Sequence, residues 1–198
     1  ARKEYGGKKV VLHDADDRQL TYDDIVRAAF ALGSALKKGT KRGEAIGVML
    51  PTGAGAIISF FALSAYGRVP AMINFSAGAR NIRAAFKAAN VKTVVTAHAF
   101  IEKAELDGLM GELKSDADFI YLEDVRAALG VKQKAAGALG PSAPFLFARG
   151  VDAGSPAVIL FTSGTEGDPK GVVLSHRNIV ANIHQILAHV PEALGLDD

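Results

Sequence analysis

The sequence predicts an α/β fold, in which a mainly parallel sheet is flanked by helices. Three observations predict it. Short apolar runs alternate along the chain with segments of helical periodicity, the order expected of repeated strand–helix units. Apolar residues make up 49% and charged residues 22% of the composition, which is typical of a globular domain. The 198 residues are enough to bury a substantial core in one large domain or two small ones.

The first helix is predicted within the stretch LTYDDIVRAAFALGSALKKG. Thr21 and Asp24 form a capping-box pattern with Asp in place of the usual Glu, so the helix is expected to begin after Thr21. Gly39 is the expected C-cap. The apolar positions that recur at helical spacing are Ile25, Ala29, Leu32 and Leu36.

Two strand–helix units and a further strand are predicted next. The run EAIGVMLP is predicted as a short strand that Pro51 ends. A helix is predicted from about Thr52 to Tyr66, and Gly67 closes it. VPAMIN is the next predicted strand and ARNIRAAFKAAN the next helix, and the β-branched run VKTVVT is predicted as another strand.

The second half of the chain continues the alternation with one interruption. A single helix is predicted near Ile101 to Leu113, followed by the strand FIYL and a short helix from Asp124. Residues 131–156 lack clear periodicity and hold three of the seven prolines, so a loop is predicted there. AVILFT and GVVLS are predicted strands. Ser175 is the predicted N-cap of a helix that carries Ile179, Ile183, Ile186 and Leu187.

The composition argues against several classes of function. The net charge of +2 comes from 23 basic and 21 acidic residues, without the basic stripe and interleaved aromatics of a nucleic-acid-binding protein. The absence of cysteine excludes disulfides, a thiolate nucleophile and a sulfur-ligated zinc site. The five histidines lack metal-ligand spacing, so no metal site is predicted. The longest apolar stretch, around Ala54 to Ala65, is too short to span a bilayer, so these residues are expected to be soluble.

The stretch most indicative of function is TSGTEGDPKG, from Thr162 to Gly171, directly after a predicted buried strand. In parallel sheets ligands bind beyond the carboxyl ends of the strands. The hydroxyl residues and glycines leave backbone N–H groups open to phosphate oxygens, and Lys170 adds a positive charge. The spacing is not that of a Walker A loop, because Pro169 replaces its second glycine and Gly171 its magnesium-binding hydroxyl. Composition alone would favour a solvated turn between two strands.

The order of these residues, with the apolar strand before them and SHRN after them, resembles the phosphate-binding signature of the adenylate-forming (AMP-binding) superfamily. Four other stretches are similar to one branch of it: LTYDDIVRAAFALGSALKK, GEAIGVMLPTGAGAIISFFALSAYGRVPAMINFSAG, FIEKAELDGL and YLEDVRAAL. The branch is the acyl-[acyl-carrier-protein] synthetase domain of 2-acylglycerophosphoethanolamine acyltransferases. The resemblance covers essentially the whole chain and is weakest between Lys132 and Pro156.

The resemblance implies that a fatty acid attacks the α-phosphate of ATP, which gives an acyl-adenylate and pyrophosphate. Acyl carrier protein then takes the acyl group, which in this branch passes to a lysophospholipid. ATP and Mg²⁺ are the implied cofactors, and the parent protein is expected at the cytoplasmic face of the inner membrane. The residues implied to surround the β- and γ-phosphates are Thr162, Ser163, Gly164, Thr165, Glu166, Gly167 and Lys170.

Glu166 stands where most superfamily members have a hydroxyl residue. A carboxylate beside a triphosphate repels it unless magnesium or Lys170 lies between them. Glu166 is therefore predicted to orient the loop or a hydrated metal, and Lys170 to act through its charge and not as a proton carrier.

The resemblance also implies that residues 1–198 form one incomplete AMP-binding domain. Residues 1–156 would be its first α/β layer, with a loop excursion near 131–156, and residues 157–198 a strand, the phosphate-binding loop and the following helix. The family's later motifs and its small C-terminal domain with the catalytic lysine are absent, so the isolated chain is predicted to be inactive. Two alternatives remain open: a fatty acid–coenzyme A ligase of the same superfamily, and a non-catalytic nucleotide- or partner-binding α/β module.

Overall fold

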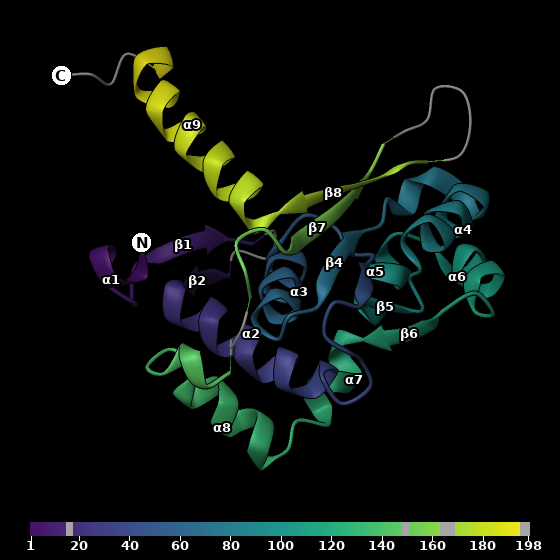
Figure 1. The fold of residues 1–198 in the computed structure, drawn as a ribbon. Helices are drawn as coiled ribbons and strands as arrows, with labels where there is room; N and C mark the ends of the chain where they lie inside the picture. The colour runs from purple at the N-terminus through teal and green to yellow at the C-terminus, as the bar shows by residue number, and fades with distance from the viewer. Residues whose placement is uncertain (15–17, 148–150, 163–168, 195–198) are drawn as a thin grey trace.

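A six-stranded sheet with helices on both faces forms the centre of the molecule (Figure 1). The computed structural model describes residues 1–14, 18–147, 151–162 and 169–194. In the six-stranded sheet the strand order is β6-β5-β3-β4-β7-β8, and a separate antiparallel pair is formed by β1 and β2. The strands of the main sheet are parallel except β8, which is antiparallel to β7. The predicted fold class, mainly parallel α/β with flanking helices, is therefore confirmed.

The bounds of the strands and helices follow the predicted alternation closely. The strands are β1 Val10–His13, β2 Gln19–Thr21, β3 Ala45–Val48, β4 Val69–Met72, β5 Thr93–Thr96, β6 Asp118–Tyr121, β7 Pro156–Phe161 and β8 Gly171–Ser175. The α-helices are α1 Arg2–Tyr5, α2 Tyr22–Leu36, α3 Ala54–Ala65, α4 Gly78–Ala89, α5 His98–Lys103, α6 Asp107–Leu113, α7 Leu122–Ala127, α8 Val131–Leu139 and α9 His176–Leu194. Two 3-10 turns complete the set, η1 Phe75–Ala77 and η2 Pro144–Leu146.

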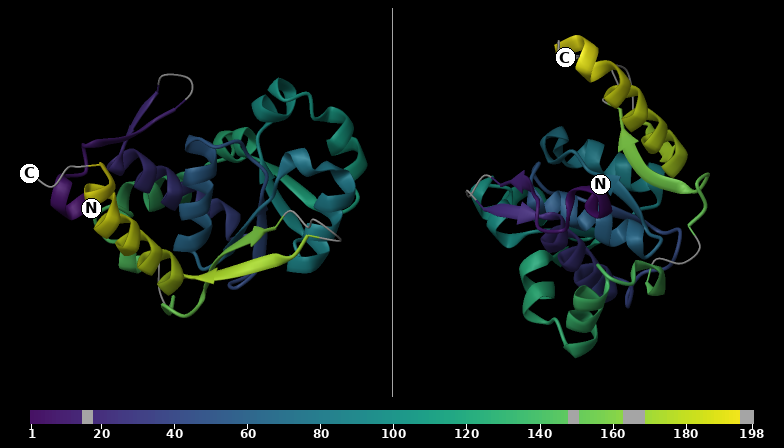
Figure 2. Two further views of the ribbon diagram at one scale, coloured as in Figure 1. Left: turned by 90° about the horizontal axis from the view of Figure 1, so that it is seen from above. Right: turned by 90° about the vertical axis from the view of Figure 1, so that its left-hand side faces the viewer.

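Two apolar clusters hold helices on the two faces of the sheet (Figure 1, Figure 2). On one face, α4, α5 and α6 pack over a cluster that includes Met49 and Val94. On the other face, α2, α3 and α7 pack over a cluster that includes Ile46, Val48 and Val95. Neighbouring residues of β5, Val94 and Val95, thus point to opposite faces and are both buried, as expected of a strand covered on both sides.

The first helix begins as predicted and ends earlier. At its start, the Asp24 N–H donates to Thr21 Oγ1 (3.2 Å) and the Thr21 N–H donates to Asp24 Oδ2 (3.0 Å). At its end, Lys37 is the C-cap, so the expected cap at Gly39 is wrong. The physical reason is that side chains satisfy the last carbonyls: Thr40 Oγ1 donates to the Leu36 C=O (2.7 Å) and Arg68 Nη2 to the Lys37 C=O (3.2 Å).

The single helix predicted near Ile101 to Leu113 is wrong, because the chain forms two short helices there. Glu105 between α5 and α6 has a left-handed φ of 53°, which ends a helix. The Leu106 N–H donates to the Ile101 C=O (2.9 Å) across this turn. The break lets Leu106 and Leu109 pack on the same apolar cluster as Ile101.

The loop predicted over residues 131–156 is also wrong in its first part, where α8 forms. Helix α8 packs on the outside of α2 (Figure 1). Its buried residues are Gln133, Ala136 and Gly137. A Cβ at Gly137 would lie 2.9 Å from the Arg27 backbone oxygen, so glycine allows the close approach. Contact with α2 therefore selects a helix that the weak periodicity of this segment does not reveal.

Removing the cap of α2 is expected to lower the free energy of unfolding by about 1 kcal/mol. Thr21→Ala deletes the hydroxyl that accepts from Asp24, whereas Thr21→Ser keeps it and serves as the matched control. Hydrogen bonds from the side chain and then the backbone of Thr21 hold the pKa of Asp24 below 3.8. Because the pKa is lowered in the folded chain, this interaction stabilises the fold at pH values above the pKa of Asp24 in the unfolded chain. The stabilisation is lost as the pH falls through the pKa of Asp24 in the folded chain.

Urea denaturation at pH 7 and near pH 2 measures this effect. The difference between Thr21→Ala and the unmodified chain should be largest at pH 7 and should shrink as acid protonates Asp24. A difference that stays the same in acid would show that the Asp24 carboxylate takes no part in the cap.

Candidate functional site

The β7–β8 hairpin brings the ends of the predicted phosphate-binding loop to the carboxyl edge of the sheet. Strand β7 is buried at Ala157, Val158 and Ile159, and it pairs in parallel with β4. On its other side it pairs with β8, and the register ends with Phe161 opposite Gly171. Because β3, β4 and β5 run parallel to β7, their carboxyl ends lie along the same edge (Figure 1). Residues 162–170 thus connect the strands where ligands of parallel sheets bind.

Two of the predicted site residues, Thr162 and Lys170, lie opposite each other at the neck of this connection. The Thr162 N–H donates to the Lys170 C=O (3.1 Å), so that amide is already bonded and only the Thr162 hydroxyl is left to contact a ligand. Both side chains are exposed, and within the described part of the chain no carboxylate forms an ion pair with Lys170. The other predicted residues, Ser163, Gly164, Thr165, Glu166 and Gly167, lie outside the described residues.

Two polar side chains fix the neighbouring part of the carboxyl edge. Thr96 is fully buried, and its Oγ1 donates to the Met49 C=O (2.9 Å), which ties the end of β5 to the residue after β3. Asn74 follows β4, and its Oδ1 accepts from the N–H (3.0 Å) and the hydroxyl (2.8 Å) of Ser76. The first contact joins β5 to the residue after β3, and the second starts the turn η1, so both side chains have a structural role at this edge of the sheet.

A second polar group lies farther along the edge, after β5 and β6. The Glu123 carboxylate accepts from the N–H groups of His98 (3.0 Å) and Ala99 (3.1 Å) and so caps α5. Burial raises the pKa of Glu123, but hydrogen bonds from backbone N–H groups and the nearby His98 outweigh it, and the pKa lies below its usual value. His98 stacks on Tyr121 with ring centroids 3.8 Å apart, and its Nε2 lies 3.1 Å from Asp124 Oδ2.

Sequence reasoning missed this group, although a signal was present. His98 and Glu123 each follow a predicted strand, and those two strands are neighbours in the sheet. The Glu123 carboxylate is bonded to the start of α5, and the His98 ring contacts Asp124 and Tyr121, which makes the role of both side chains structural.

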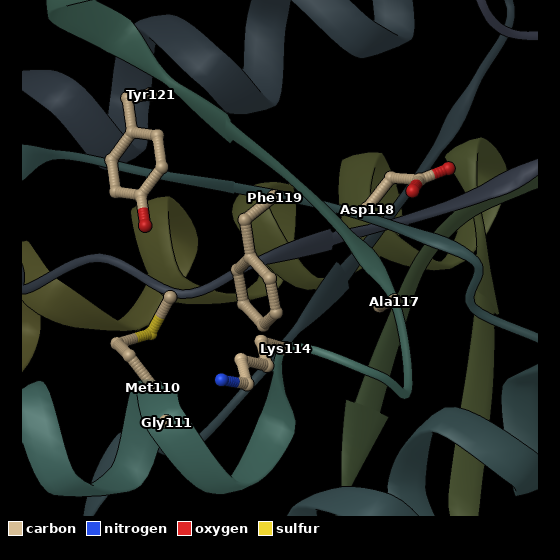
Figure 3. A pocket seen from close by; sticks show the side chains of 7 residues that line it. All are labelled: Met110, Gly111, Lys114, Ala117, Asp118, Phe119 and Tyr121. Carbon is tan, nitrogen blue, oxygen red and sulfur yellow. The ribbon is translucent and has the colours of Figure 1, made fainter.

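Two surface hollows lie beside the edge strand β6 and not at the β7–β8 hairpin. One, of about 410 Å³, lies between α6 and β6. Figure 3 shows Met110, Phe119 and Lys114 gathered around it. The other, of about 340 Å³, lies nearer His98 and shares Met110 and Tyr121 with the first. In the strand order, β5, β3 and β4 separate β6 from β7. The hollows and the predicted loop are therefore alternative locations for a ligand, and only the loop carries the phosphate-binding pattern.

The described residues do not by themselves provide a metal site. Within residues 1–14, 18–147, 151–162 and 169–194, no group of three or more His, Asp or Glu side chains could hold a metal ion. Over the same part of the chain, none of the helices has both the length and the apolar character that crossing a membrane requires.

Fold and site together define a class: an α/β protein with a mainly parallel sheet and a glycine- and hydroxyl-rich connection at its carboxyl edge. The chain belongs to the AMP-binding enzyme family, because the model of that family matches residues 1–198. This result confirms the resemblance to the adenylate-forming superfamily that the loop and its flanks indicated.

Curated relatives include ligases of several carboxylic acids. The chain is 26% identical over 184 residues to 4-coumarate–CoA ligase of Vanilla planifolia. This match covers 91% of the present chain and 32% of that protein. A 39-residue stretch is 54% identical to long-chain-fatty-acid–CoA ligase 1 of Schizosaccharomyces pombe, covering 20% of this chain and 6% of that one. A 45-residue stretch is 44% identical to a chloroplastic long-chain-fatty-acid–[acyl-carrier-protein] ligase of Arabidopsis thaliana, covering 23% and 6%. The chain thus spans no more than about a third of these relatives.

Solved structures show the same fold. The complex of VinN with 3-methylaspartate superposes with a TM-score of 0.74 at 24% identity, covering 93% of this chain and 49% of that chain. ATP-bound MatB from Rhodopseudomonas palustris superposes with a TM-score of 0.69 at 21% identity, covering 92% and 35%. The arrangement of strands and helices is therefore that of adenylate-forming enzymes.

Proposed function

We propose that the chain is part of an ATP-dependent acyl-activating enzyme that forms a fatty acyl-adenylate and passes the acyl group to acyl carrier protein. The observation that carries the proposal is the loop at residues 162–170, which has the superfamily's residue order and connects β7 to β8 at the carboxyl edge of the sheet. Family membership supports a nucleotide substrate. The ATP in the similar MatB structure supports ATP as that nucleotide.

In this reaction a carboxylate oxygen of the fatty acid forms a bond to the α-phosphorus of ATP, and the bond to pyrophosphate breaks. Negative charge collects on the pyrophosphate oxygens as they leave. The Thr162 hydroxyl and the Lys170 ammonium stand exposed at the neck of the loop, where they would meet these oxygens. Ser163, Gly164, Thr165 and Gly167 would add further donors, and removing one such donor typically costs roughly 3 kcal/mol of barrier.

We also propose roles for Mg²⁺ and Glu166 in this reaction. The described residues do not form a set of metal ligands, so triphosphate oxygens would supply most of the coordination of Mg²⁺. Glu166 would orient the loop or a water on that metal.

Residues 1–198 are proposed to be one incomplete AMP-binding domain. Residues 1–156 would be the first α/β layer and residues 157–198 the strand, the phosphate-binding loop and the following helix. The chain covers only 32% of the Vanilla planifolia relative and 49% of the VinN chain, which supports an incomplete domain. The isolated chain is accordingly expected to show no ATP–pyrophosphate exchange with a long-chain fatty acid. Exchange above that of a Lys170→Ala control would contradict the proposal that the domain is incomplete.

The proposal also names the acyl acceptor and the final product. The 45-residue similarity to a fatty-acid–[acyl-carrier-protein] ligase supports acyl carrier protein as the acceptor. The branch resemblance of the sequence adds transfer to a lysophospholipid, 2-acylglycerophosphoethanolamine, by a parent protein at the cytoplasmic face of the inner membrane. The similarity to a fatty-acid–CoA ligase supports coenzyme A as the alternative acceptor.

Titration of the chain with ATP tests where the nucleotide binds. Lys170→Ala is expected to weaken ATP binding about tenfold or more, because a charge-assisted contact to phosphate is worth about 1.5–3 kcal/mol. Lys114→Ala is the matched control, since Lys114 is also an exposed lysine and lines the hollow between α6 and β6. Isothermal titration of both variants and the unmodified chain measures the difference.

The two variants separate the two locations. Weakening by Lys170→Ala alone supports the loop. Weakening by Lys114→Ala alone would move the nucleotide to the hollow and overturn the proposed site. No measurable ATP binding by the unmodified chain, with the fold intact by circular dichroism, would favour the non-catalytic partner-binding module.

A further inference from the structure

Helix α8 turns a stripe of apolar side chains to solvent, on the side that faces away from α2 (Figure 1, Figure 2). At about 100° per residue, its buried residues all lie on the opposite side. The outward arc, about 100° wide, holds four exposed apolar residues: Val131, Ala135, Ala138 and Leu139. We call these four residues the α8 stripe. Val131 is 85% exposed and Leu139 54%, so no described element covers the stripe.

A lysine lies at each edge of the α8 stripe. On the helix, Lys134 lies about 40° beyond one edge and Lys132 about 20° beyond the other. Both side chains are exposed, and within the part of the chain that the structure describes no carboxylate forms an ion pair with either. Between Val125 and Phe147 the sequence has no Asp or Glu. The stripe is therefore bordered by positive charge alone.

Two further apolar side chains protrude just beyond the end of α8. Phe145 is 65% exposed and Leu146 is 51% exposed, and both belong to η2. The next residue, Phe147, packs its ring on Phe30 of α2, with ring centroids 5.4 Å apart. This contact anchors η2 and leaves the two preceding side chains in solvent. We call the α8 stripe, its two lysines and this exposed pair the α8–η2 surface.

Contacts with α2 and α1 hold α8 in place before any partner binds. A Cβ at Gly137 would lie 2.9 Å from the Arg27 backbone oxygen, which shows how closely α8 lies on α2. After the end of α8, the Pro141 C=O accepts from Arg2 Nη1 (2.9 Å). Arg2 Nε in turn donates to Asp23 of α2 (2.6 Å), so that nearby carboxylate is already paired. The surface is preformed, and a partner does not have to order it.

We propose that the α8–η2 surface docks on an anionic lipid bilayer. The apolar side chains enter the boundary between headgroups and acyl chains, and the Lys132 and Lys134 ammonium groups reach back to the phosphates. An apolar stripe bordered by lysines is typical of helices that lie in the plane of a membrane interface. The inference goes beyond the proposed function, in which the parent protein meets a membrane and these residues serve acyl activation.

The shape and charge of the α8–η2 surface favour a bilayer over a protein partner. Its apolar side chains protrude, whereas the two hollows described above lie at β6. A protein partner would have to supply a pocket shaped for each protruding side chain. A fluid bilayer accommodates them in any arrangement, and its headgroup phosphates complement the two lysines.

Flotation of the 198-residue chain with phospholipid vesicles tests the proposal. The chain should bind vesicles of phosphatidylcholine and phosphatidylglycerol about tenfold more tightly than vesicles of phosphatidylcholine alone, and salt should weaken the binding. Lys132→Glu/Lys134→Glu and, separately, Val131→Ser/Leu139→Ser should each weaken binding to the mixed vesicles about tenfold or more. Lys132→Arg/Lys134→Arg keeps both charges and should bind as the unmodified chain does.

Two matched controls make the same kinds of change elsewhere. Lys87→Glu/Lys92→Glu reverses two exposed lysines near α4, on the other side of the sheet from α2, and should leave vesicle binding unchanged. Ile183→Ser/Leu187→Ser removes two exposed apolar side chains of α9 and should also leave it unchanged. Circular dichroism of each variant confirms that a loss of binding is not a loss of fold.

Several outcomes would overturn the proposal. Loss of binding only in the α9 variant would move the membrane contact to α9. Equal binding to both kinds of vesicle would contradict the role of the lysines, and no binding to either would leave the surface without a bilayer. Binding to soluble polyglutamate but not to vesicles, removed by Lys132→Glu/Lys134→Glu, would make the partner an acidic polypeptide. None of these measurements uses a nucleotide, so they are independent of the Lys170→Ala titration.

Discussion

Arg68→Ala is expected to lower the free energy of unfolding by about 4 kcal/mol. Arg68 is only 8% exposed, yet its guanidinium donates to three backbone carbonyls, those of Lys37, Thr40 and Tyr66, and to Thr40 Oγ1. Burial and then the charge of Arg42 lower the pKa of Arg68, and Glu44 opposes them. The group stays protonated because an arginine pKa lies far above neutral. Removing it leaves several buried acceptors without donors.

Urea denaturation of three variants checks this prediction. Arg68→Lys keeps the charge but loses the planar fork of donors, so it should lose roughly half as much stability as Arg68→Ala. Arg83→Ala is the control, because Arg83 is an exposed arginine whose Nε lies 2.9 Å from Asp116 Oδ2. This variant should lower the free energy of unfolding by less than about 1 kcal/mol. Equal losses for Arg68→Ala and Arg83→Ala would contradict the role of the buried network.

Gly33→Ala is expected to destabilise the fold by about 2 kcal/mol, although alanine favours helices. Gly33 lies where α2 crosses α3. A Cβ there would stand 2.3 Å from Tyr66 Cδ2 and 2.5 Å from the Ala62 backbone oxygen. The Tyr66 ring cannot move away freely, because its hydroxyl donates to the Phe30 C=O (3.1 Å). Overpacking of this kind costs about 1–3 kcal/mol or more, which exceeds the gain in helix propensity.

Gly111→Ala provides the matched control. Gly111 lies inside α6, and a Cβ there would meet nothing within 4 Å. The same substitution should therefore stabilise the chain by about 0.5–1 kcal/mol. Thermal denaturation should show shifts of opposite sign for the two variants. A rise in melting temperature for Gly33→Ala would contradict the close crossing of α2 and α3.

The sequence predicts the centre of the sheet well because strands β3, β4 and β5 are buried between helices on both faces. Short apolar runs such as Thr93–Thr96 and Ala45–Val48, when they lie between helices in the sequence, have few conformations open to them other than a buried parallel strand. The sequence also predicts the capping box at Thr21 and the N-cap at Ser175, because both depend on local hydrogen bonds. At the second of these, Ser175 Oγ accepts from the Asn178 N–H (3.2 Å).

The errors fall where distant contacts decide the local structure. The end of α2 is set by Arg68, which is 31 residues away from Lys37. Helix α8 exists because Gly137 meets the backbone of α2 at Arg27. The break at Glu105 and the pairing of β1 with β2 likewise have no strong local signal. Short-range patterns do not contain this information.

The candidate site could be predicted only in part. The position of the loop after a buried strand followed from the sequence, and the register of β7 with β8 agrees with that position. The bond between the Thr162 N–H and the Lys170 C=O could not be foreseen, because it depends on how far the hairpin pairing continues. The roles of Ser163 to Gly167 remain predictions.

Amide chemical shifts of the 198-residue chain, recorded with and without saturating ATP, test whether the connection between β7 and β8 binds the phosphates. The largest changes are expected on amides between Thr162 and Gly171, and the amides of Met110 to Tyr121 should stay unchanged within experimental error. Changes confined to Met110 to Tyr121, with residues 162–171 unaffected, would contradict the claim that the hairpin connection binds the phosphates.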